Sequence, residues 1–92
     1  MELKWTSKAL SDLVRLYEFL APASRQAAAQ TVQSLTTTPS TTLLKNPRIG
    51  EQLFEFAPRQ VRRLLVGQYE MRYEVRDNTI YMLRIWHSRE ER

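Results

Sequence analysis

Hydrophobic and polar positions divide the chain into two regions that follow different periods. In the first region, hydrophobic residues recur every three or four positions, the spacing of one face of an α-helix. The repeat follows Ser7 and comprises Leu10, Leu13, Val14, Tyr17 and Leu20. Thr6 or Ser7 can cap this helix, and Pro22 ends it because proline disfavours helical backbone at the residue before it. We therefore predict a short strand over 3–6 and a helix over 7–20.

A second helix is predicted from the Ser24 cap to about Thr36, where Pro39 stops it. Its apolar stripe is narrow and made of small or aliphatic residues, so it can lie close against the first helix. The stripe comprises Ala28, Val32 and Leu35. A brief third turn over 43–44 is compatible with the pattern.

The second region alternates between hydrophobic and charged positions, the period of a half-buried strand. The alternation is clearest over 69–76, and strands over 61–66 and 80–87 flank it. The pairs Gly67-Gln68 and Asp77-Asn78 are typical two-residue hairpin turns. Residues 51–56 are a candidate edge strand. The expected fold class is α+β: a short N-terminal strand and a two-helix hairpin packed on one face of an antiparallel three- to four-stranded sheet, in one domain over 1–92.

Two-residue turns define the register, so the two faces of the sheet can be assigned from the sequence. If Val66 pairs with Tyr69 and Val75 with Ile80, the face beneath the helices carries Leu64, Val66, Tyr69, Met71, Tyr73, Val75, Ile80, Met82 and Trp86, with Arg62 and Arg84 at its rim. The opposite face carries Val61, Arg63, Leu65, Glu70, Arg72, Glu74, Arg76, Tyr81, Leu83, Ile85 and His87. A one-residue slip in the second hairpin would exchange the faces of the last strand.

The opposite face combines charge with an apolar stripe of Val61, Leu65, Tyr81, Leu83 and Ile85. An apolar stripe rimmed by charge usually marks a binding surface. In the alternative interpretation, the segment around Phe54 and Phe56 folds over the stripe and covers it.

Composition narrows the classes of function. The 92 residues carry a net charge of +4, and nine of the eleven arginines follow Asn46, which suggests an anionic partner. In the alternative interpretation this is a solvated charged surface, because seven of the ten acids lie in the same half. The absence of cysteine excludes disulfides, thiol catalysis and cysteine-ligated zinc, and His87 is the single histidine. We expect no metal or cofactor. No apolar run is long enough to span a membrane, and residues 1–4 lack a signal-peptide pattern, so we expect a protein of a reducing cytoplasm.

The stretch Val61–Tyr73 contains the pattern G-x-Y-x-x-x-Y, and it is followed by Ile80 and by the run 85–90 (Ile-Trp-His-Ser-Arg-Glu). With the order of elements, this resembles the RelE/ParE superfamily of bacterial toxins, the toxic halves of type II toxin–antitoxin systems. The resemblance implies a bacterial cytoplasmic protein, often plasmid-borne, in a hetero-oligomer with a cognate antitoxin, ParD-like or similar, whose segment wraps over helices and sheet.

The superfamily contains two kinds of activity. RelE-like members are ribosome-dependent mRNA endonucleases, whereas ParE-like members inhibit DNA gyrase and have no established catalytic residues. This sequence has Glu70 where many nucleases have arginine, Arg62 and Arg63 in place of lysines, and no tyrosine after Tyr81. These departures favour the ParE-like branch, with gyrase as target and DNA contacted at most indirectly. The residues expected to bind target or partner are Arg63, Arg72, Leu83, Ile85, His87 and Arg89.

Two alternatives remain open on the sequence. In the first, the protein is an mRNA endonuclease in which His87 and Glu70 transfer protons and Arg72 stabilises the phosphate charge. In the expected register Glu70 lies opposite Ile85, and His87 is the next residue of that strand on the same face. In the second, a degenerate toxin serves only as an autoregulatory partner of its antitoxin.

Overall fold

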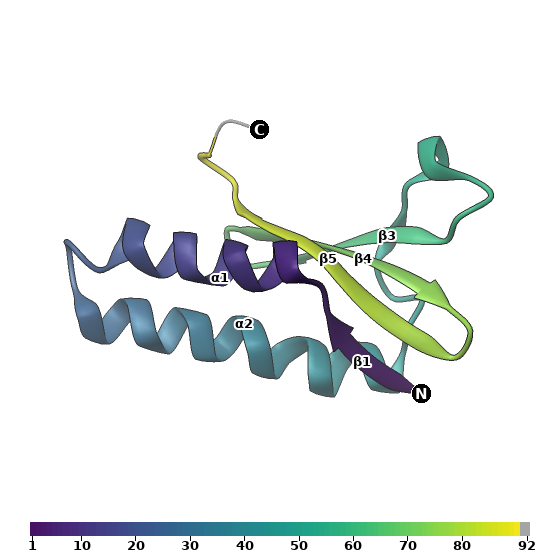
Figure 1. Ribbon diagram of the computed structural model, residues 1–92, viewed down its shortest axis with the longest axis horizontal. Coiled ribbons are helices and arrows are strands. Elements are labelled where there is room, and N and C mark those ends of the chain that lie inside the picture. Colours follow the sequence, from purple (N-terminus) through teal and green to yellow (C-terminus); the bar gives the residue numbers. More distant parts are fainter. Residues whose placement is uncertain (91–92) are drawn as a thin grey trace.

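The computed structural model describes residues 1–90 and contains two layers, with both helices on one side of a sheet (Figure 1). The elements are β1 (Glu2–Trp5), α1 (Ser7–Leu20), α2 (Arg25–Lys45), β2 (Glu51–Gln52), the 3-10 helix η1 (Phe54–Phe56), β3 (Val61–Val66), β4 (Tyr69–Arg76) and β5 (Thr79–His87). The sheet has five strands in the order β1-β5-β4-β3-β2. The α+β class is confirmed, although β1 adds a parallel pairing with β5 to an otherwise antiparallel sheet. None of the described helices combines the length and apolarity that a membrane span requires.

Helix α1 has the predicted bounds, but the face that it buries differs from the predicted one. The Thr6 side chain caps it by accepting a hydrogen bond from the Ala9 N–H. The buried residues are Ala9, Asp12, Leu13 and Leu16, whereas Leu10, Val14 and Tyr17 are 51%, 59% and 36% exposed. Apolar residues occur on both sides of this helix, so the hydrophobic period alone does not show which side is buried. The small Ala9 permits close packing, and Asp12 is buried because it has polar partners on the sheet.

Helix α2 continues through Pro39 to Lys45, so the predicted end near Thr36 is wrong. Pro39 is buried on the same side as Leu35 and Leu43, and this burial favours continuing the helix despite the lost N–H. Nearby hydroxyl groups also donate hydrogen bonds to helix carbonyls three or four residues earlier; they belong to Thr36, Thr37, Ser40 and Thr41. The predicted burial of Ala28 and Leu35 is confirmed.

Both hairpins have the predicted turns. Val66 pairs with Tyr69 across Gly67-Gln68, and Val75 pairs with Ile80 above Asp77-Asn78. Asp77 and Asn78 have φ angles of 51° and 59°, and Gly67 has 58°, as this class of turn requires. The edge strand predicted over 51–56 pairs only at Glu51 and Gln52.

A β-bulge at Leu83 changes the faces assigned to the end of β5. Tyr73 pairs with Met82 but Arg72 pairs with Arg84, so Leu83 has no partner on β4. Beyond the bulge the alternation shifts by one residue. Arg84 and Trp86 therefore share a face with Arg72 and Glu70, whereas Ile85 and His87 share the helix side with Met71 and Tyr69. The predicted faces of residues 84–87 are wrong for this reason.

Helix α1 supplies the hydrogen bonds that β5 lacks beyond the bulge. β1 pairs with β5 only from Thr79 to Met82. At the end of that pairing the Thr6 hydroxyl donates to the Met82 carbonyl (2.8 Å). Beyond the bulge Asp12 accepts from the Ile85 N–H (2.8 Å), and Arg15 donates to the Ile85 carbonyl (2.9 Å). Side chains thus satisfy a strand edge that would otherwise be unpaired.

Candidate functional site

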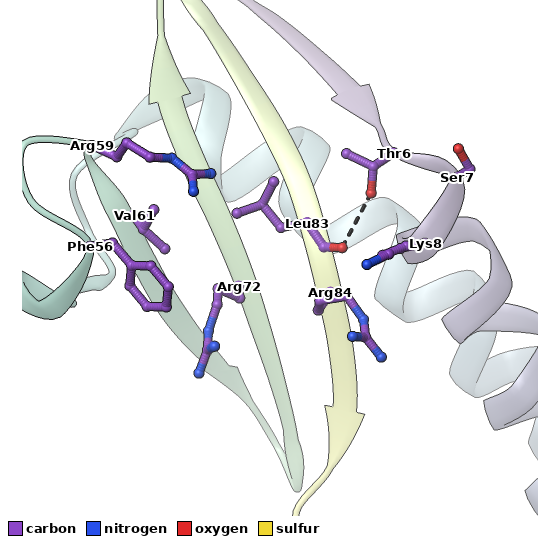
Figure 2. A pocket seen from close by; sticks show the side chains of 9 residues that line it. All are labelled: Thr6, Ser7, Lys8, Phe56, Arg59, Val61, Arg72, Leu83 and Arg84. Carbon is purple, nitrogen blue, oxygen red and sulfur yellow. Dashed lines mark hydrogen bonds between the residues drawn. The ribbon is translucent and has the colours of Figure 1, made fainter. Parts of the chain in front are cut away.

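The face of β3, β4 and β5 that points away from the helices, here called the open face, contains a hollow of about 420 Å³. Figure 2 shows the side chains around this open-face hollow, which come from β3, β4, β5, the start of α1 and the η1 region. They are Thr6, Ser7, Lys8, Phe56, Arg59, Val61, Arg72, Leu83 and Arg84. Four of the nine are cations and none is an acid, so the surface presented to solvent is cationic above an apolar floor.

The η1 segment forms one wall of the hollow and does not close it. Phe56 is half-buried beside Arg72, but Phe54 is 73% exposed. The two interpretations of the apolar stripe therefore apply to different residues. Val61 is fully buried, as expected for a covered stripe, whereas Leu65 is 67% exposed, as expected for a binding surface.

Two of the arginines around the hollow each form paired hydrogen bonds with a buried carboxylate. Arg59 donates to both oxygens of Glu74 (3.2 and 2.9 Å), and Arg84 donates to both oxygens of Asp12 (2.8 and 3.2 Å). The hydrogen bond from Arg59 holds the pKa of Glu74 below its ordinary value. Each guanidinium is therefore fixed in place and keeps its remaining N–H groups for other contacts.

Arg72 lies between two aromatic rings at the centre of the open face. Its guanidinium carbon is 5.5 Å from the Phe56 ring and 4.8 Å from the Trp86 ring, and Arg84 lies 5.0 Å from the same indole. Such cation–π contacts stabilise by about 0.5–2 kcal/mol each. One terminal nitrogen of Arg72 donates to Glu70 (3.2 Å), but its Nε is buried with no hydrogen-bond partner.

Lys8 differs from the arginines because it forms no hydrogen bond or ion pair within residues 1–90. It lies in the first turn of α1, which contains no acidic residue, and its side chain extends toward β5 (Figure 2). Its ammonium group is therefore available to a ligand at the rim of the hollow.

His87 lies on the helix side of the sheet, away from Glu70. It pairs with Tyr69, whose ring is 5.0 Å away edge-on, and the Phe19 ring is 6.0 Å away on the other side. Its Nδ1 accepts the Arg89 N–H (3.1 Å), and the residue is only 8% exposed. Glu70 instead pairs with Trp86, so the bulge separates the two groups that the nuclease hypothesis requires to be together.

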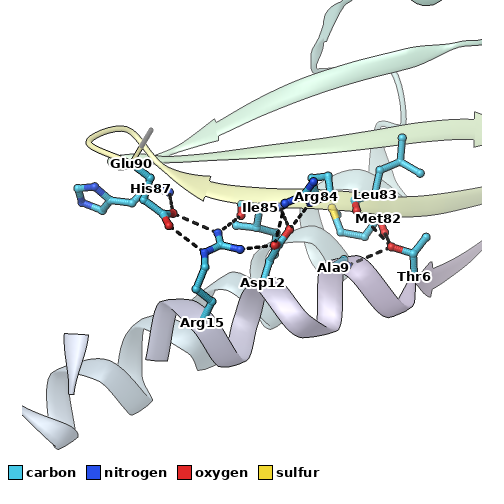
Figure 3. Close-up of polar contacts among 10 residues, drawn as sticks. All are labelled: Thr6, Ala9, Asp12, Arg15, Met82, Leu83, Arg84, Ile85, His87 and Glu90. Atoms are coloured by element: carbon cyan, nitrogen blue, oxygen red, sulfur yellow. Dashed lines mark hydrogen bonds and ion pairs between the residues drawn. The ribbon is translucent and has the colours of Figure 1, made fainter. Parts of the chain in front are cut away.

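A polar network ties the segment after β5 to α1 (Figure 3). Glu90 accepts hydrogen bonds from Arg15 (2.8 and 3.1 Å) and from the His87 N–H (2.8 Å). Arg15 also contacts Asp12, which in turn holds Arg84. Hydrogen bonds from Arg15 hold the pKa of Glu90 below its ordinary value. Burial acts to raise the pKa of Asp12, but hydrogen bonds from Arg84, the Ile85 N–H and Arg15 outweigh it and leave the pKa lowered.

The structure thus brings together some of the residues predicted for target or partner binding and separates others. Arg72 and Leu83 line the hollow, and Arg63 lies beside it on β3, paired with Glu51 (2.5 Å) and Glu70 (3.7 Å). Arg89 is exposed. Ile85 is fully buried in the core, so the expectation that it lies on an exposed binding face is wrong.

Sequence reasoning missed Lys8, Arg59, Asp12, Arg15 and Glu90. The period of α1 placed Lys8, Asp12 and Arg15 on its outer side, because a pattern of apolar residues carries no information on where a strand edge needs polar partners. Within the described residues, no group of three histidine, cysteine, aspartate or glutamate side chains could hold a metal ion.

Comparison with known proteins agrees with this architecture. One of the matching solved structures, described as the chromosomal ParDE toxin–antitoxin system from P. aeruginosa, is 27% identical with a TM-score of 0.79 and covers 95% of both chains. A search of curated protein sequences returned no match. Residues 3–92 match the family model described as the ParE toxin of the type II toxin–antitoxin system parDE. A two-layer fold of this topology and a family match along nearly the whole sequence lead to one assignment: the chain belongs to the ParE toxin family of type II toxin–antitoxin systems.

Proposed function

We propose that this ParE-family toxin inhibits DNA gyrase in the bacterial cytoplasm when its antitoxin is not bound. In this proposal the toxin acts by contact with gyrase or its DNA complex and makes or breaks no covalent bond. The antitoxin, as the second component of the system, prevents this contact.

The observation that carries the proposal is the arrangement of the open face. Cleavage of RNA at a 2′-hydroxyl needs a base, an acid and a cation for the charge on phosphorus. The open face has cations, but His87 lies on the other side of the sheet from Glu70. A surface of fixed cations and apolar residues is suited to binding a macromolecule by contact.

The endonuclease alternative retains one supporting feature, the cluster in which Glu70 lies between Arg63 and Arg72. A carboxylate with two guanidinium groups could supply a base and phosphate-binding cations without histidine. The proposal must therefore be tested against RNA cleavage in the same experiment.

The experiment gives the full-length toxin two targets side by side. One sample contains gyrase, relaxed plasmid and ATP; the other contains a translating ribosome–mRNA complex. We expect blocked supercoiling or trapped cleaved DNA in the first sample and intact mRNA in the second. An Arg63→Ala variant should lose the gyrase effect, whereas Arg25→Ala, at an exposed α2 position, should keep it.

Cut mRNA with unaffected gyrase would overturn the proposal in favour of the endonuclease. No effect in either sample would also overturn it and would favour a degenerate toxin that only binds its antitoxin.

A further inference from the structure

We propose that the open-face hollow is a binding site for one phosphate group of a nucleotide or polynucleotide. The proposal rests on the side chains around the hollow and does not depend on whether gyrase is the target. At about 420 Å³, the hollow lies within the range of small-molecule sites and is large enough for a phosphate with its sugar.

The charges around the hollow all have one sign at its surface. Lys8, Arg59, Arg72 and Arg84 come from four different segments, and none of the nine lining residues is acidic. The acids that pair with two of them are buried, with Asp12 and Glu74 only 2% and 5% exposed. An anion in the hollow therefore meets cations directly, while the balancing carboxylates are shielded from solvent.

The available donors favour a tetrahedral anion over a planar carboxylate. Arg59 and Arg84 each already use Nε and one terminal nitrogen on a buried carboxylate, so neither can offer that same paired edge to a second carboxylate. Each keeps N–H groups at its terminal nitrogens, so the hollow offers donors from separate segments. The oxygens of a phosphate, three on a terminal monoester and two non-bridging ones on a diester, are arranged tetrahedrally and can accept from such separate directions, whereas the two oxygens of a carboxylate lie in one plane.

Two donors at this hollow have no hydrogen-bond partner among the described residues. The Nε of Arg72 is buried without a hydrogen bond, and Lys8 has neither a hydrogen bond nor an ion pair. A cation in the first turn of a helix is opposed by the helix dipole, and this first turn contains no acid that would offset it. The same dipole attracts an anion, so a bound phosphate would relieve the unfavourable position of Lys8.

The test is an NMR titration of the full-length chain with three probes at constant ionic strength: inorganic phosphate, adenosine monophosphate and a single-stranded thymidylate octamer. We expect saturable shifts of the backbone amides of Ser7, Lys8 and Arg84. Lys8→Gln should raise the dissociation constant about tenfold, the effect of losing a charged hydrogen bond. The matched variant Lys45→Gln removes the same charge at the C-terminal end of α2, outside the lining of the hollow, and should bind as the parent does.

The three probes also distinguish the source of the phosphate. Equal affinity for the monophosphate and the octamer per phosphate group indicates a free nucleotide, and tighter binding of the octamer per phosphate group indicates a polynucleotide; either result supports the site. Absence of saturable shifts with all three probes would overturn it, as would equal losses in both lysine variants.

A glutamate-rich peptide tests whether carboxylates bind the same hollow in place of phosphate. If the peptide shifts the same amides and phosphate does not displace it, the hollow is a site for an acidic protein segment and the phosphate proposal is wrong. Because both lysines lie on exposed helix positions, the amide spectra of the variants should remain dispersed, which separates loss of binding from loss of fold.

Discussion

At the scale of single residues, Asp12 links helix α1 to strand β5 through several hydrogen bonds. Its carboxylate accepts hydrogen bonds from Arg84, from the Ile85 N–H and from Arg15, all while its side chain is 3% exposed. A buried carboxylate is tolerated only when it is paired and hydrogen-bonded in this way. Asp12 thus joins the helix, the edge of β5 and the rim of the open-face hollow.

Replacing Asp12 with alanine should lower the free energy of unfolding by about 3 kcal/mol, the lower end for breaking a buried ion pair. The effect falls at that end because Arg15 and Arg84 are more than a third exposed and can turn toward water, although the Ile85 N–H would stay buried without an acceptor. Urea unfolding measures the change. Glu18→Ala, an exposed acid on the same helix, should change it by less than about 0.5 kcal/mol; equal effects would contradict this role for Asp12.

The free energy of unfolding should decrease in acid, because three carboxylates have lowered pKa values in the folded protein. Asp12, Glu74 and Glu90 have pKa values below their ordinary 3.8 or 4.5 in the folded state. Protons therefore bind the unfolded chain first as the pH falls, so the stabilisation is present above the ordinary values and is lost as the pH falls through the lowered ones. The urea midpoint should drop from about pH 5 downward. An unchanged midpoint down to pH 3, or an equal slope in Asp12→Asn, would contradict the assignment.

At the scale of elements, the bulge at Leu83 decides what the end of β5 presents to each side. One unpaired residue moves Trp86 and Arg84 to the open face and places Ile85 and His87 against the helices. The cation–π contacts around Trp86 and the separation of His87 from Glu70 both follow from that single residue. Bulges of this kind often redirect side chains beside functional sites.

Because Leu83 has no partner on β4, deleting it should leave the protein folded and cost about 1–3 kcal/mol, and Leu83→Ala should cost about 1 kcal/mol. The deletion makes the alternation regular while the Arg72–Arg84 pair remains, so Ile85 stays against the helices. Near-ultraviolet circular dichroism and the cooperativity of urea unfolding measure the difference. A deletion variant that no longer unfolds cooperatively would contradict the pairing described on the two sides of the bulge.

At the scale of the whole molecule, the two sides of the sheet have different roles. The helix side contains the core, which includes Leu13, Leu16, Leu35, Met71, Tyr73 and Ile85. The open face has no second layer over the hollow and carries the cations. The outer side of α1 adds a second exposed apolar region of Leu10, Val14 and Tyr17. Toxicity should depend on the exposed basic residues, and stability on the helix side.

Changing Arg63 and Arg89 together to alanine should abolish growth inhibition in cells that lack the antitoxin, while the unfolding midpoint changes little. Arg63 is 40% exposed and pairs with the exposed Glu51 and, at 3.7 Å, with the buried Glu70, which also pairs with Arg72. Arg89 binds His87 through its backbone N–H and not through its side chain. Exposed ion pairs of this kind contribute about 0–1 kcal/mol to stability. Growth inhibition and thermal unfolding are the two measurements. Unchanged growth inhibition would exclude both arginines from the functional surface.

The sequence alone was sufficient for the elements and for the hairpin turns. Strict alternation over Tyr69–Arg76 and the turns at Gly67 and Asn78 depend on local geometry, which neighbouring residues determine. The family likeness was also visible in the sequence, because it rests on residues that are close together along the chain. The separation of positive charge into the second half could be read directly from composition.

Only the tertiary structure decided which face of α1 is buried, whether α2 stops at Pro39, and which side of the sheet receives His87. The first depends on the hydrogen bond between Asp12 and the distant Ile85, the second on the burial of Pro39 in the folded protein, and the third on how β5 pairs with β4 around Leu83. A one-residue bulge leaves no mark on hydrophobic periodicity yet reverses every side chain after it. For that reason the hollow of Lys8, Arg59, Arg72 and Arg84, assembled from four distant segments, emerges only once the chain is folded.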